Sequence, residues 1–384
     1  MKIILAVDAI HRPLTGIGRY TWEISQGLKA SAEVTELKFF SHGRWVQDPA
    51  DVLAPGPISP ISSARKVLAS SGLATAAYGM LMPAATRWRL RKHRDYLFHS
   101  PNFFLPSCPG PALATFHDLS TLDCPDFHPD VRIAFMRREI PKALRRATAL
   151  IADSEFTRQR IIDHFKWPED RVHKVLLGVD HNQYAPSDFL LKKQILKKLT
   201  LHSNSYVLCV STIEPRKNLD RLIHAYGRLP DSVRADCPLV IVGHTGWHSD
   251  QTHTLMQACS EAGWLHYLGY LPQEQLPVLL SGCALFVFPS LYEGFGLPVL
   301  EAMASAVPVI ASDIAPVREF AGNVIRYFDP YDTESITNGL QKALDDSQWR
   351  RLAGGQSRQQ SLQFTWAKTV RQLIKVYECF PAGE

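Results

Sequence analysis

Residues 288–301 read FPSLYEGFGLPVLE. The apolar residues up to Phe288 are typical of a buried strand. Pro298 suits the first turn of a helix, because the N–H that proline lacks would have no partner there. Between them, Gly294 and Gly296 let the backbone approach a ligand closely. The segment therefore predicts a strand, a glycine-containing loop and a helix in direct succession.

The same alternation of short apolar strands and helices continues on both sides of this segment. We expect strands at residues 2–8, 112–117, 149–153, 206–210, 239–242, 284–288 and 308–311. We expect helices at residues 19–28, 155–165, 219–226, 274–280, 298–304 and 366–377. Such alternation is typical of parallel sheets covered by helices on both faces. It predicts an α/β protein with two Rossmann-like, doubly wound parallel-sheet domains, whose ligands bind beyond the carboxyl ends of the strands.

The length of 384 residues suits two domains. Residues 180–205 are polar and rich in lysine, which is typical of a region between domains. We therefore expect a first domain at residues 1–182, a second at 183–364 and a terminal segment at 365–384.

Charge, cysteines and hydropathy narrow the class of protein. The net charge of +5 is too small to indicate a nucleic-acid partner by itself. The seven cysteines are odd in number and have no C-x-x-C spacing, which argues against a disulfide framework and against a zinc site. No apolar stretch has the length of a membrane span, and Asp8 and His11 interrupt the apolar start of the chain. We expect a cytoplasmic protein that needs no metal.

Two carboxylates, Glu293 and Glu301, flank the glycine loop. Carboxylates accept hydrogen bonds from sugar and ribose hydroxyls, and the unpaired N–H groups at a helix start favour a phosphate. One segment would thus hold a sugar, a diphosphate and a ribose. An ordinary strand–turn–helix, with a glutamate that interacts with the helix dipole, explains the spacing equally well.

This segment resembles the E-x7-E motif of retaining glycosyltransferases with the GT-B fold, in particular the large family 4. The resemblance implies that Glu301 holds the ribose and that Glu293 contacts the transferred sugar. It also implies that the N–H groups of Gly296 and Leu297 contact phosphate, with Gly294 and Phe295 completing this donor-binding loop. In this family the donor binds the second domain and the acceptor binds the first, and the last helix crosses back to the first domain.

Residues 210–219, VSTIEPRKNL, follow the first strand of the second domain and resemble the E-P-R-K-N loop of the family. There the basic pair, here Arg216 and Lys217, stabilises the departing diphosphate without a metal. Many relatives carry Gly-Arg where this chain has Ser211 and Thr212, which also belong to the expected donor site. Lys217 is therefore the firmer assignment, and a solvated Arg-Lys pair before a helix is the alternative.

The glycine loop TGIGRY, residues 15–20, resembles the N-terminal loop of the family that faces the donor phosphates. The family often has a glycine where this chain has Thr15, so only Gly16 and Gly18 carry over. A dinucleotide fingerprint does not fit, because the third glycine and the acidic ribose partner are absent.

A histidine, His117, ends the strand expected at residues 112–117. In family relatives a histidine at this strand end lies near the transferred sugar. The alternative is a structural histidine whose tautomer Asp118 fixes. In the second domain, residues 267–272 resemble the loop that contacts the nucleotide base, which makes Leu268 a donor-site candidate.

Two basic segments carry interleaved aromatic residues. The first contains Arg87, Trp88, Arg89, Arg91 and Lys92; the second spans residues 131–147. Such segments suit an anionic membrane surface, and we name the first as a candidate contact with the inner face of the cytoplasmic membrane. A solvated helix face explains both segments equally well.

The combined motifs resemble bacterial mannosyltransferases and deoxymannose transferases that build O-antigen polysaccharide. They imply a retaining, metal-independent transfer of mannose or D-rhamnose from a GDP-sugar to a saccharide or lipid-linked saccharide. A UDP-sugar-dependent enzyme of the same fold, either a transferase or a sugar-nucleotide 2-epimerase, stays open. So does a two-lobed sugar-binding protein without catalysis.

Overall fold

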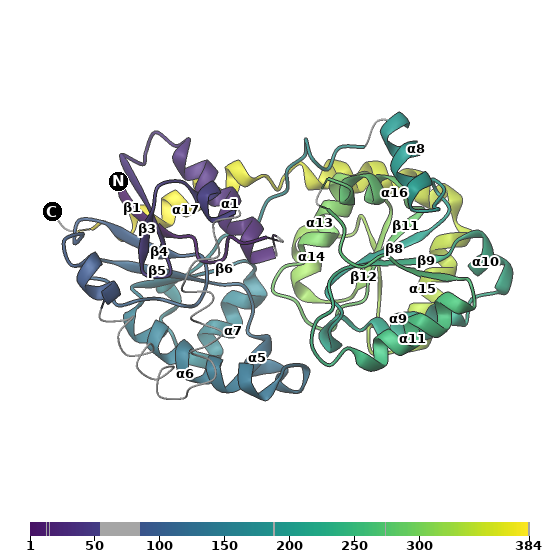
Figure 1. Ribbon diagram of the computed structural model, residues 1–384, viewed down its shortest axis with the longest axis horizontal. Helices are drawn as coiled ribbons and strands as arrows, with labels where there is room; N and C mark the ends of the chain where they lie inside the picture. Colours follow the sequence, from purple (N-terminus) through teal and green to yellow (C-terminus); the bar gives the residue numbers. More distant parts are fainter. Residues whose placement is uncertain (13, 15, 54–84, 187–188, 273, 383–384) are drawn as a thin grey trace.

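The chain folds into two α/β units, each built on one sheet (Figure 1). The computed structural model describes all residues except 13, 15, 54–84, 187–188, 273 and 383–384. Within the described part, the predicted architecture of two doubly wound parallel-sheet domains is confirmed, with one antiparallel strand at the edge of the first sheet.

The first sheet has seven strands in the order β3-β2-β1-β4-β5-β6-β7. Their bounds are β1 (Lys2–Ala6), β2 (Glu36–Ser41), β3 (Arg44–Val46), β4 (Leu97–Ser100), β5 (Ala112–Phe116), β6 (Ala149–Ala152) and β7 (Val172–Lys174). Among the described strands, only β2 and β3 pair antiparallel, through a turn in which His42 and Gly43 both have positive φ (49° and 79°), as a tight hairpin requires. The central strands are buried on both faces, so their carboxyl ends and the following loops are left to hold ligands.

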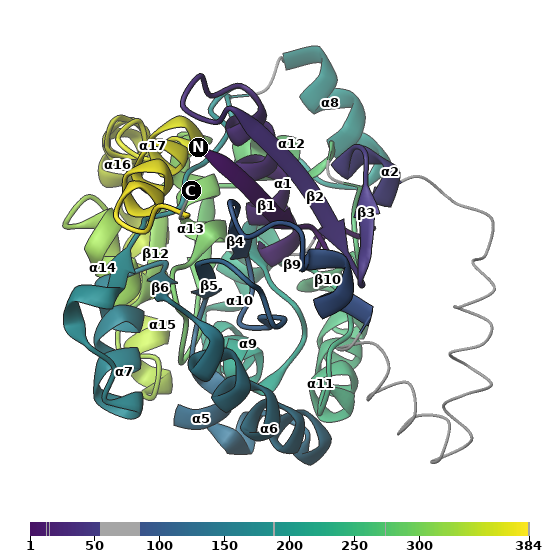
Figure 2. The ribbon, with the colours of Figure 1, turned by 90° about the vertical axis from the view of Figure 1, so that its left-hand side faces the viewer.

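Helices cover both faces of this sheet (Figure 2). They are α1 (Gly16–Lys29), α2 (Pro49–Leu53), α5 (Ser120–Asp123), α6 (Asp130–Arg146) and α7 (Glu155–Phe165), with single 3-10 turns at Pro125–Phe127 and Glu169–Arg171. The predicted helix 155–165 has the observed bounds. Ser154 is its N-cap, because the Ser154 hydroxyl accepts a hydrogen bond from the Thr157 N–H (3.2 Å).

The second sheet has six parallel strands in the order β10-β9-β8-β11-β12-β13. They are β8 (Val207–Val210), β9 (Leu239–Val242), β10 (Leu265–Tyr267), β11 (Leu285–Phe288), β12 (Val309–Ser312) and β13 (Arg326–Phe328). The helices are α8 (Phe189–Lys198), α9 (Leu219–Gly227), α10 (Asp231–Asp236), α11 (Asp250–Glu261), α12 (Leu276–Gly282), α13 (Leu297–Ala304), α14 (Ala315–Ala321), α15 (Thr333–Asp345) and α16 (Ser347–Ser361), with a 3-10 turn at Pro215–Lys217. The polar stretch at 180–205 thus contains a helix, α8.

The last helix, α17 (Trp366–Glu378), lies against α1 of the first unit (Figure 1). A Cβ built on Gly27 of α1 would lie 2.4 Å from Val370, so this glycine permits the close approach of the two helices. The Tyr377 hydroxyl bonds the buried His99 of β4 (2.7 Å). The chain therefore returns to the domain in which it began. Within the described residues, no helix is both long and apolar enough to span a bilayer.

Candidate active site

The loop after β8 carries two cations to the carboxyl end of β11. A Cβ on Gly243, which follows β9, would lie 1.7 Å from the Ser211 carbonyl oxygen, so the two loops pack backbone to backbone. Asn218 has left-handed backbone geometry (φ 59°), and its amide donates to the carbonyls of Pro289 (3.0 Å) and Pro330 (2.8 Å). These contacts fix the 3-10 turn at Pro215–Lys217 beside the E-x7-E segment.

Glu293 is held between both cations of this turn. Its Oε1 accepts a hydrogen bond from Lys217 Nζ (2.5 Å) and its Oε2 accepts one from Arg216 Nη1 (2.9 Å). Arg216 also binds the buried Glu214 (2.8 Å). Burial opposes ionisation of Glu293, but the charges of Arg216 and Lys217 outweigh it and lower the pKa of this carboxyl. Glu293 is therefore a buried carboxylate whose charge is stabilised by the two cations.

The glycine loop presents its backbone while its side chains pack inward. The Phe295 ring stacks on Phe320 (centroids 4.7 Å apart), and Leu297 packs against the core. Gly296 has φ +117° and precedes α13. Among the described residues, no hydrogen-bond partner is found for the N–H groups of Gly296 and Leu297. This is the arrangement that binds a phosphate at a helix N-terminus.

Three buried hydroxyls lie at the carboxyl ends of neighbouring strands. Ser211 follows β8, Ser290 follows β11, and Ser312 ends β12. In the part of the chain that the structure describes, the three Oγ atoms are buried and make no hydrogen bond of normal geometry, although Ser290 lies close enough to Glu293, and Ser211 to Cys209, to offset part of the rise that burial causes in the pKa of each. Buried polar groups are usually satisfied, so unpaired ones at a sheet edge indicate a polar ligand. Thr212, the neighbour of Ser211, is half-buried beside Gly246.

His117 is paired with Asp153, and the expectation that Asp118 fixes its tautomer is wrong. His117 Nδ1 lies 2.6 Å from Asp153 Oδ2, and Nε2 lies 2.9 Å from the Pro101 carbonyl oxygen. Asp118 instead accepts two hydrogen bonds from Ser120. Both ring nitrogens therefore face oxygen atoms, those of Asp153 and of the Pro101 carbonyl.

The pKa shifts of this pair follow from burial and from the close contact. Burial alone would lower the pKa of His117, but the Asp153 carboxylate and the hydrogen bonds to Asp153 and Pro101 raise it. Burial also raises the pKa of Asp153. The short contact and the second acceptor at Pro101 favour the imidazolium–carboxylate form.

The donor loop is in direct contact with the first domain. A Cβ on Gly294 would lie 1.6 Å from the His117 carbonyl oxygen. The Gly294 carbonyl accepts a hydrogen bond from the Ser154 hydroxyl (2.6 Å), and the Tyr292 hydroxyl donates to Asp123 (2.7 Å). The backbone carbonyl of His117, rather than its ring, therefore touches the loop that carries Glu293.

Glu301 faces the first turn of α1. Its carboxylate accepts a hydrogen bond from Tyr184 and is attracted by Arg19. Burial raises the pKa of Glu301, and these two neighbours offset only part of that rise. Gly16 and Gly18 lie in the same turn of α1, with Gly16 exposed and Gly18 buried. Thr15 lies outside the described residues.

A cavity of about 640 Å³ lies between the two domains. Its lining is Arg12, Leu14, Arg19, Trp22 and Leu53 of the first domain, and His244, Tyr270, Pro272 and Glu274 of the second. The rings of His244 and Tyr270 are stacked, with centroids 4.2 Å apart. The predicted residue Leu268 packs against the core instead, while Tyr270 of the same loop reaches the cavity.

Comparison with known proteins gives the family. A model described as "Glycosyltransferase Family 4" matches residues 14–183, and one described as "Glycosyl transferases group 1" matches residues 192–360. Over 383 residues the chain is 37% identical to the O-antigen chain mannosyltransferase B of Escherichia coli, covering 98% of this chain and 100% of that protein. The chain belongs to the family 4, group 1 glycosyltransferases.

Other similar proteins agree with this assignment. The serotype-specific mannosyltransferase WbdA of Escherichia coli is 33% identical over 60% of this chain, which spans only 28% of that longer protein. WaaG, "a glycosyltransferase involved in lipopolysaccharide biosynthesis", has a TM-score of 0.75 at 16% identity and covers 99% of this chain and 100% of its own. Anabaena Alr3699/HepE in complex with UDP and glucose has a TM-score of 0.73 at 17% identity, with the same coverage. The structural likeness confirms the GT-B fold.

The sequence-predicted residues of this glycosyltransferase gather in two groups. In one group Arg216 and Lys217 both contact Glu293, and His117 packs its backbone carbonyl against the neighbouring Gly294. In the other, Glu301 faces the first turn of α1, which holds Gly16 and Gly18. Sequence reasoning missed Asp153, Tyr184 and His244. Asp153 was detectable in principle, because it follows β6, the parallel neighbour of the strand that precedes His117. His244 belongs to a loop with no recognisable spacing, whereas its stacking partner Tyr270 lies in the segment 267–272 that was expected to contact the nucleotide base.

The basic segment at residues 87–92 of the glycosyltransferase is largely exposed. Trp88 is 60% exposed, and the Arg91 guanidinium lies 4.8 Å from its ring. Arg87 and Lys92 are also exposed, whereas Arg89 donates a hydrogen bond to the Gly43 carbonyl. Arg89 therefore has a structural contact that the sequence did not indicate. On α6, Met136 is buried in the core, and Phe135 stays 42% exposed.

Proposed function

We propose that this glycosyltransferase transfers mannose, with retention, from GDP-mannose to the growing saccharide of a cell-surface polysaccharide. The mannosyl specificity is supported by the similarity, over nearly the whole chain, to an O-antigen chain mannosyltransferase. One observation carries the chemistry. Buried Glu293 is held by Lys217 and Arg216, and on the same segment the N–H groups of Gly296 and Leu297 have no hydrogen-bond partner among the described residues. Two cations, free N–H groups for a phosphate and a carboxylate for sugar hydroxyls, all near the carboxyl end of β11, support this chemistry.

An exchange of partners explains how the cluster works. The donor diphosphate displaces Glu293 from Lys217 and Arg216, which frees the carboxylate to accept hydrogen bonds from the sugar hydroxyls. When the bond from the sugar to the diphosphate breaks, the leaving group takes the electron pair, and the two cations stabilise its charge. The acceptor hydroxyl attacks from the same face and gives its proton to the departing phosphate oxygen. No protein nucleophile is needed, since positioning and charge stabilisation lower the barrier.

We further propose that the transfer is independent of metal, because Arg216 and Lys217 supply the positive charge that a divalent ion would otherwise give to the diphosphate. Transfer should therefore persist in EDTA. The proposed guanine specificity needs a direct test, because Anabaena Alr3699/HepE, a structural neighbour, was solved with UDP.

The deciding experiment is a thermal-shift and calorimetry series with GDP, UDP, ADP and their sugar conjugates, in the presence of EDTA. A ligand that binds only the folded protein stabilises it in proportion to ln(1 + [L]/Kd). We expect stabilisation by GDP and GDP-mannose, and loss of that stabilisation in Glu301→Ala. Stabilisation by UDP alone would refute the donor assignment, and no response to any nucleotide would refute the transferase proposal.

The Lys217→Ala variant tests the catalytic part of the proposal. We expect its turnover of GDP-mannose to fall by about 10²–10³-fold, the usual loss when one group that stabilises transition-state charge is removed. Its melting temperature should stay close to that of the wild type, since Arg216 still pairs with Glu293. Near-normal turnover of a folded variant would show that Lys217 does not stabilise the diphosphate.

We propose a second, separate role for the exposed basic segment, which is contact with an anionic bilayer. Trp88 with Arg91 over its ring, flanked by exposed Arg87 and Lys92, presents an aromatic ring within positive charge. We expect co-sedimentation with phosphatidylglycerol vesicles and weaker co-sedimentation of Trp88→Ala. Equal binding of both proteins, or equal binding to uncharged phosphatidylcholine vesicles, would refute this role.

A further inference from the structure

A tryptophan of the second domain reaches across to the first domain. Trp247 lies between β9 and α11, and its indole Nε1 donates a hydrogen bond to the Phe127 carbonyl oxygen (2.6 Å). The Arg132 guanidinium lies 4.6 Å from the centroid of the indole ring, and the centroid of the His128 ring lies 5.6 Å from it. An indole offers one N–H donor and a negative face that attracts a cation, and here the first domain binds both.

The Trp247 loop is fastened to the loop that carries the two cations of the candidate site. The Gly246 N–H donates to the Ile213 carbonyl (3.0 Å), and the Ile213 N–H donates to the His244 carbonyl (2.8 Å). A Cβ on Gly246 would lie 2.6 Å from the Ile213 carbonyl oxygen, so only glycine allows this approach. Ile213 is fully buried, and the 3-10 turn at Pro215–Lys217 begins two residues after it. A displacement of Trp247 is therefore transmitted to this turn.

The same part of the first domain also contacts the other half of the charged cluster. Asp123, at the end of α5, accepts a hydrogen bond from the hydroxyl of Tyr292 in the E-x7-E segment (2.7 Å). Within the first-domain segment, His128 Nε2 lies 3.0 Å from the Ser120 hydroxyl oxygen, which holds its two ends together. Residues 120–132 thus bind the E-x7-E segment through α5 and the loop after β9 through the residues that follow α5.

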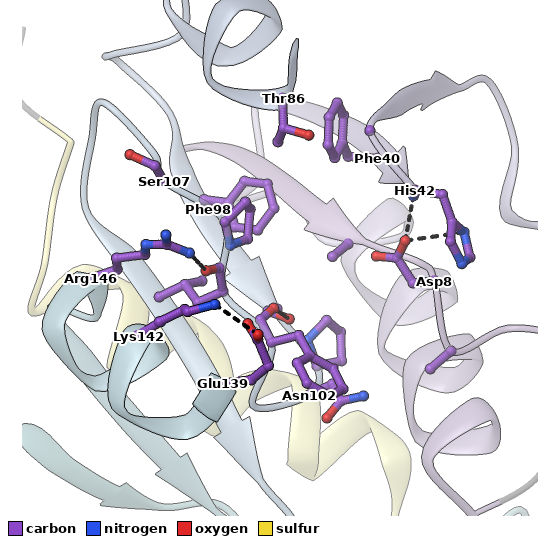
Figure 3. A pocket seen from close by; sticks show the side chains of 18 residues that line it. Asp8, Phe40, His42, Thr86, Phe98, Asn102, Ser107, Glu139, Lys142 and Arg146 are labelled. Carbon is purple, nitrogen blue, oxygen red and sulfur yellow. Dashed lines mark hydrogen bonds and ion pairs between the residues drawn. The ribbon is translucent and has the colours of Figure 1, made fainter. Parts of the chain in front are cut away.

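The segment that receives Trp247 is fixed to the first sheet, because it continues into α6. Met136 and Ile140 of this helix are buried in the core of the first domain. Figure 3 shows the C-terminal end of α6, where Arg146 donates to the Leu105 carbonyl (2.9 Å) at the wall of a cavity of about 370 Å³. Since α6 is anchored along its length, it gives Trp247 a rigid partner.

Trp247 contributes little to the core of either domain. In the described chain it packs against none of the three hydrophobic clusters, whereas Trp264 and Trp349 of the same domain do. His248, the next residue, has a φ of 51°, which is uncommon for a residue other than glycine and persists only where neighbouring contacts hold it. The contacts of Trp247 therefore serve the arrangement of the two domains rather than the folding of one.

On these grounds we propose that Trp247 is a positioning residue for the transfer. It sets the turn of Arg216 and Lys217 at the distance from the E-x7-E segment that a diphosphate needs when it takes the place of Glu293. The inference rests on the proposed function, because it assigns those cations to the departing diphosphate. Rates depend steeply on such distances, since a misplacement of about 1 Å costs on the order of 10²-fold.

The test compares Trp247→Phe and Trp247→Ala with the wild type and with Trp349→Phe. Trp349 is the matched control, because Arg326 lies 4.0 Å from its ring in the same domain and none of the contacts above involves it. GDP release from GDP-mannose, in the presence of α-linked mannotriose, gives kcat, and calorimetry gives the Kd for GDP. We expect kcat to fall roughly fivefold in Trp247→Phe, which loses one hydrogen bond, and about 10²-fold in Trp247→Ala.

The Kd for GDP should be the same in all four proteins, since the groups proposed to bind GDP lie on the second domain. A role in stability alone would lower the melting temperature and leave the kcat of the folded protein unchanged, which would overturn the positioning role. A rise in the Kd for GDP that matches the loss of kcat would overturn it as well, because Trp247 would then act on binding.

Arg132→Met shows whether Arg132 and Trp247 act together. Alone it should lower kcat, and added to Trp247→Ala it should have no further effect, because its partner ring is gone. An equal loss in both backgrounds would overturn the shared contact. The same proteins are assayed with UDP-glucose, and a wild type active only with that donor would count against the GDP-mannose proposal alone. A wild type that turns over neither donor would refute the proposed function, whereas an active wild type with unaffected Trp247 variants would refute this inference alone.

Discussion

Two buried pairs of opposite charge lie on either side of the contact between the domains. In the second domain Lys217 and Glu293 are 2.5 Å apart, with side chains 12% and 11% exposed. In the first domain His117 and Asp153 are 2.6 Å apart, with side chains 13% and 3% exposed. Their geometry is nearly the same. What differs is the set of groups around each pair.

Near Glu293 in the described chain there are hydrogen-bond donors without a protein acceptor. Among the described residues, the N–H groups of Gly296 and Leu297, on the same segment, have no hydrogen-bond partner. Around His117, both ring nitrogens are already bound, to Asp153 and to the Pro101 carbonyl. A short, buried ion pair therefore does not by itself identify a catalytic group. Under the proposed mechanism, the first pair exchanges partners with the donor, whereas the second holds the backbone at Pro101 and His117 in place.

The largest effect should come from Glu293→Gln. Its turnover should fall by about 10²–10³-fold, because the sugar loses a charged hydrogen-bond acceptor in the transition state. Its affinity for GDP should stay equal or increase, since Lys217 and Arg216 no longer have Glu293 as a competing partner. Steady-state kinetics and calorimetry measure the two quantities, with Glu261→Gln on the exposed side of α11 as the control. A parallel loss of GDP affinity and turnover would argue against the exchange of partners.

Gly294→Ala tests the contact that joins the two regions. A Cβ at this position would lie 1.6 Å from the His117 carbonyl oxygen, so the domains must move apart. A misplacement of about 1 Å costs on the order of 10²-fold in rate, and we expect a loss of that size. Small-angle scattering should show a larger radius of gyration. Gly355→Ala, with no atom within 4 Å of the new Cβ, is the matched control. Normal turnover in Gly294→Ala would mean that catalysis does not need this contact.

Asp153→Asn should have a smaller effect on catalysis and a larger one on stability. The amide keeps a hydrogen-bond acceptor for His117 but removes the charge that favours the imidazolium. We expect turnover to fall about tenfold through misplacement of the His117 backbone. The melting temperature should drop, because breaking a buried pair costs about 3–5 kcal/mol at most. GDP affinity should be unchanged, and NMR should show a lower pKa for His117. If the pKa of His117 did not change, Asp153 would not be the group that positions His117.

The two pairs also differ in how far the sequence predicts them. Lys217 and Glu293 lie in loops whose residue types and spacing are local, so a short motif was enough to propose their contact. Asp153 is 36 residues from His117 and meets it only because β5 and β6 are parallel neighbours. No short sequence motif therefore predicts the contact between His117 and Asp153. The strands β2 and β4 were missed for a related reason, since ELKFFS and LFHS mix polar and apolar residues and are short.

The smallest expected effect is on how stability depends on pH. The two pairs should lose their contributions to the free energy of unfolding at opposite ends of the pH range. The folded-state pKa of His117 is raised above 6.5, so its contribution is complete below that pH and is lost as the pH rises through the folded pKa. The folded-state pKa of Glu293 is lowered below 4.5, so its contribution is present above that pH and is lost as the pH falls through the folded pKa.

Melting temperatures from acid to alkaline pH therefore distinguish the pairs. Asp153→Asn should flatten the alkaline decline alone, and Glu293→Gln should flatten the acid decline alone. If Asp153→Asn left the alkaline decline intact, His117 would be neutral in the folded protein. One of its two ring contacts would then lack a proton, so the His117–Asp153 ion pair could not be what holds the His117 backbone in place. The exchange of partners proposed for Lys217 and Glu293 would be unaffected by this result.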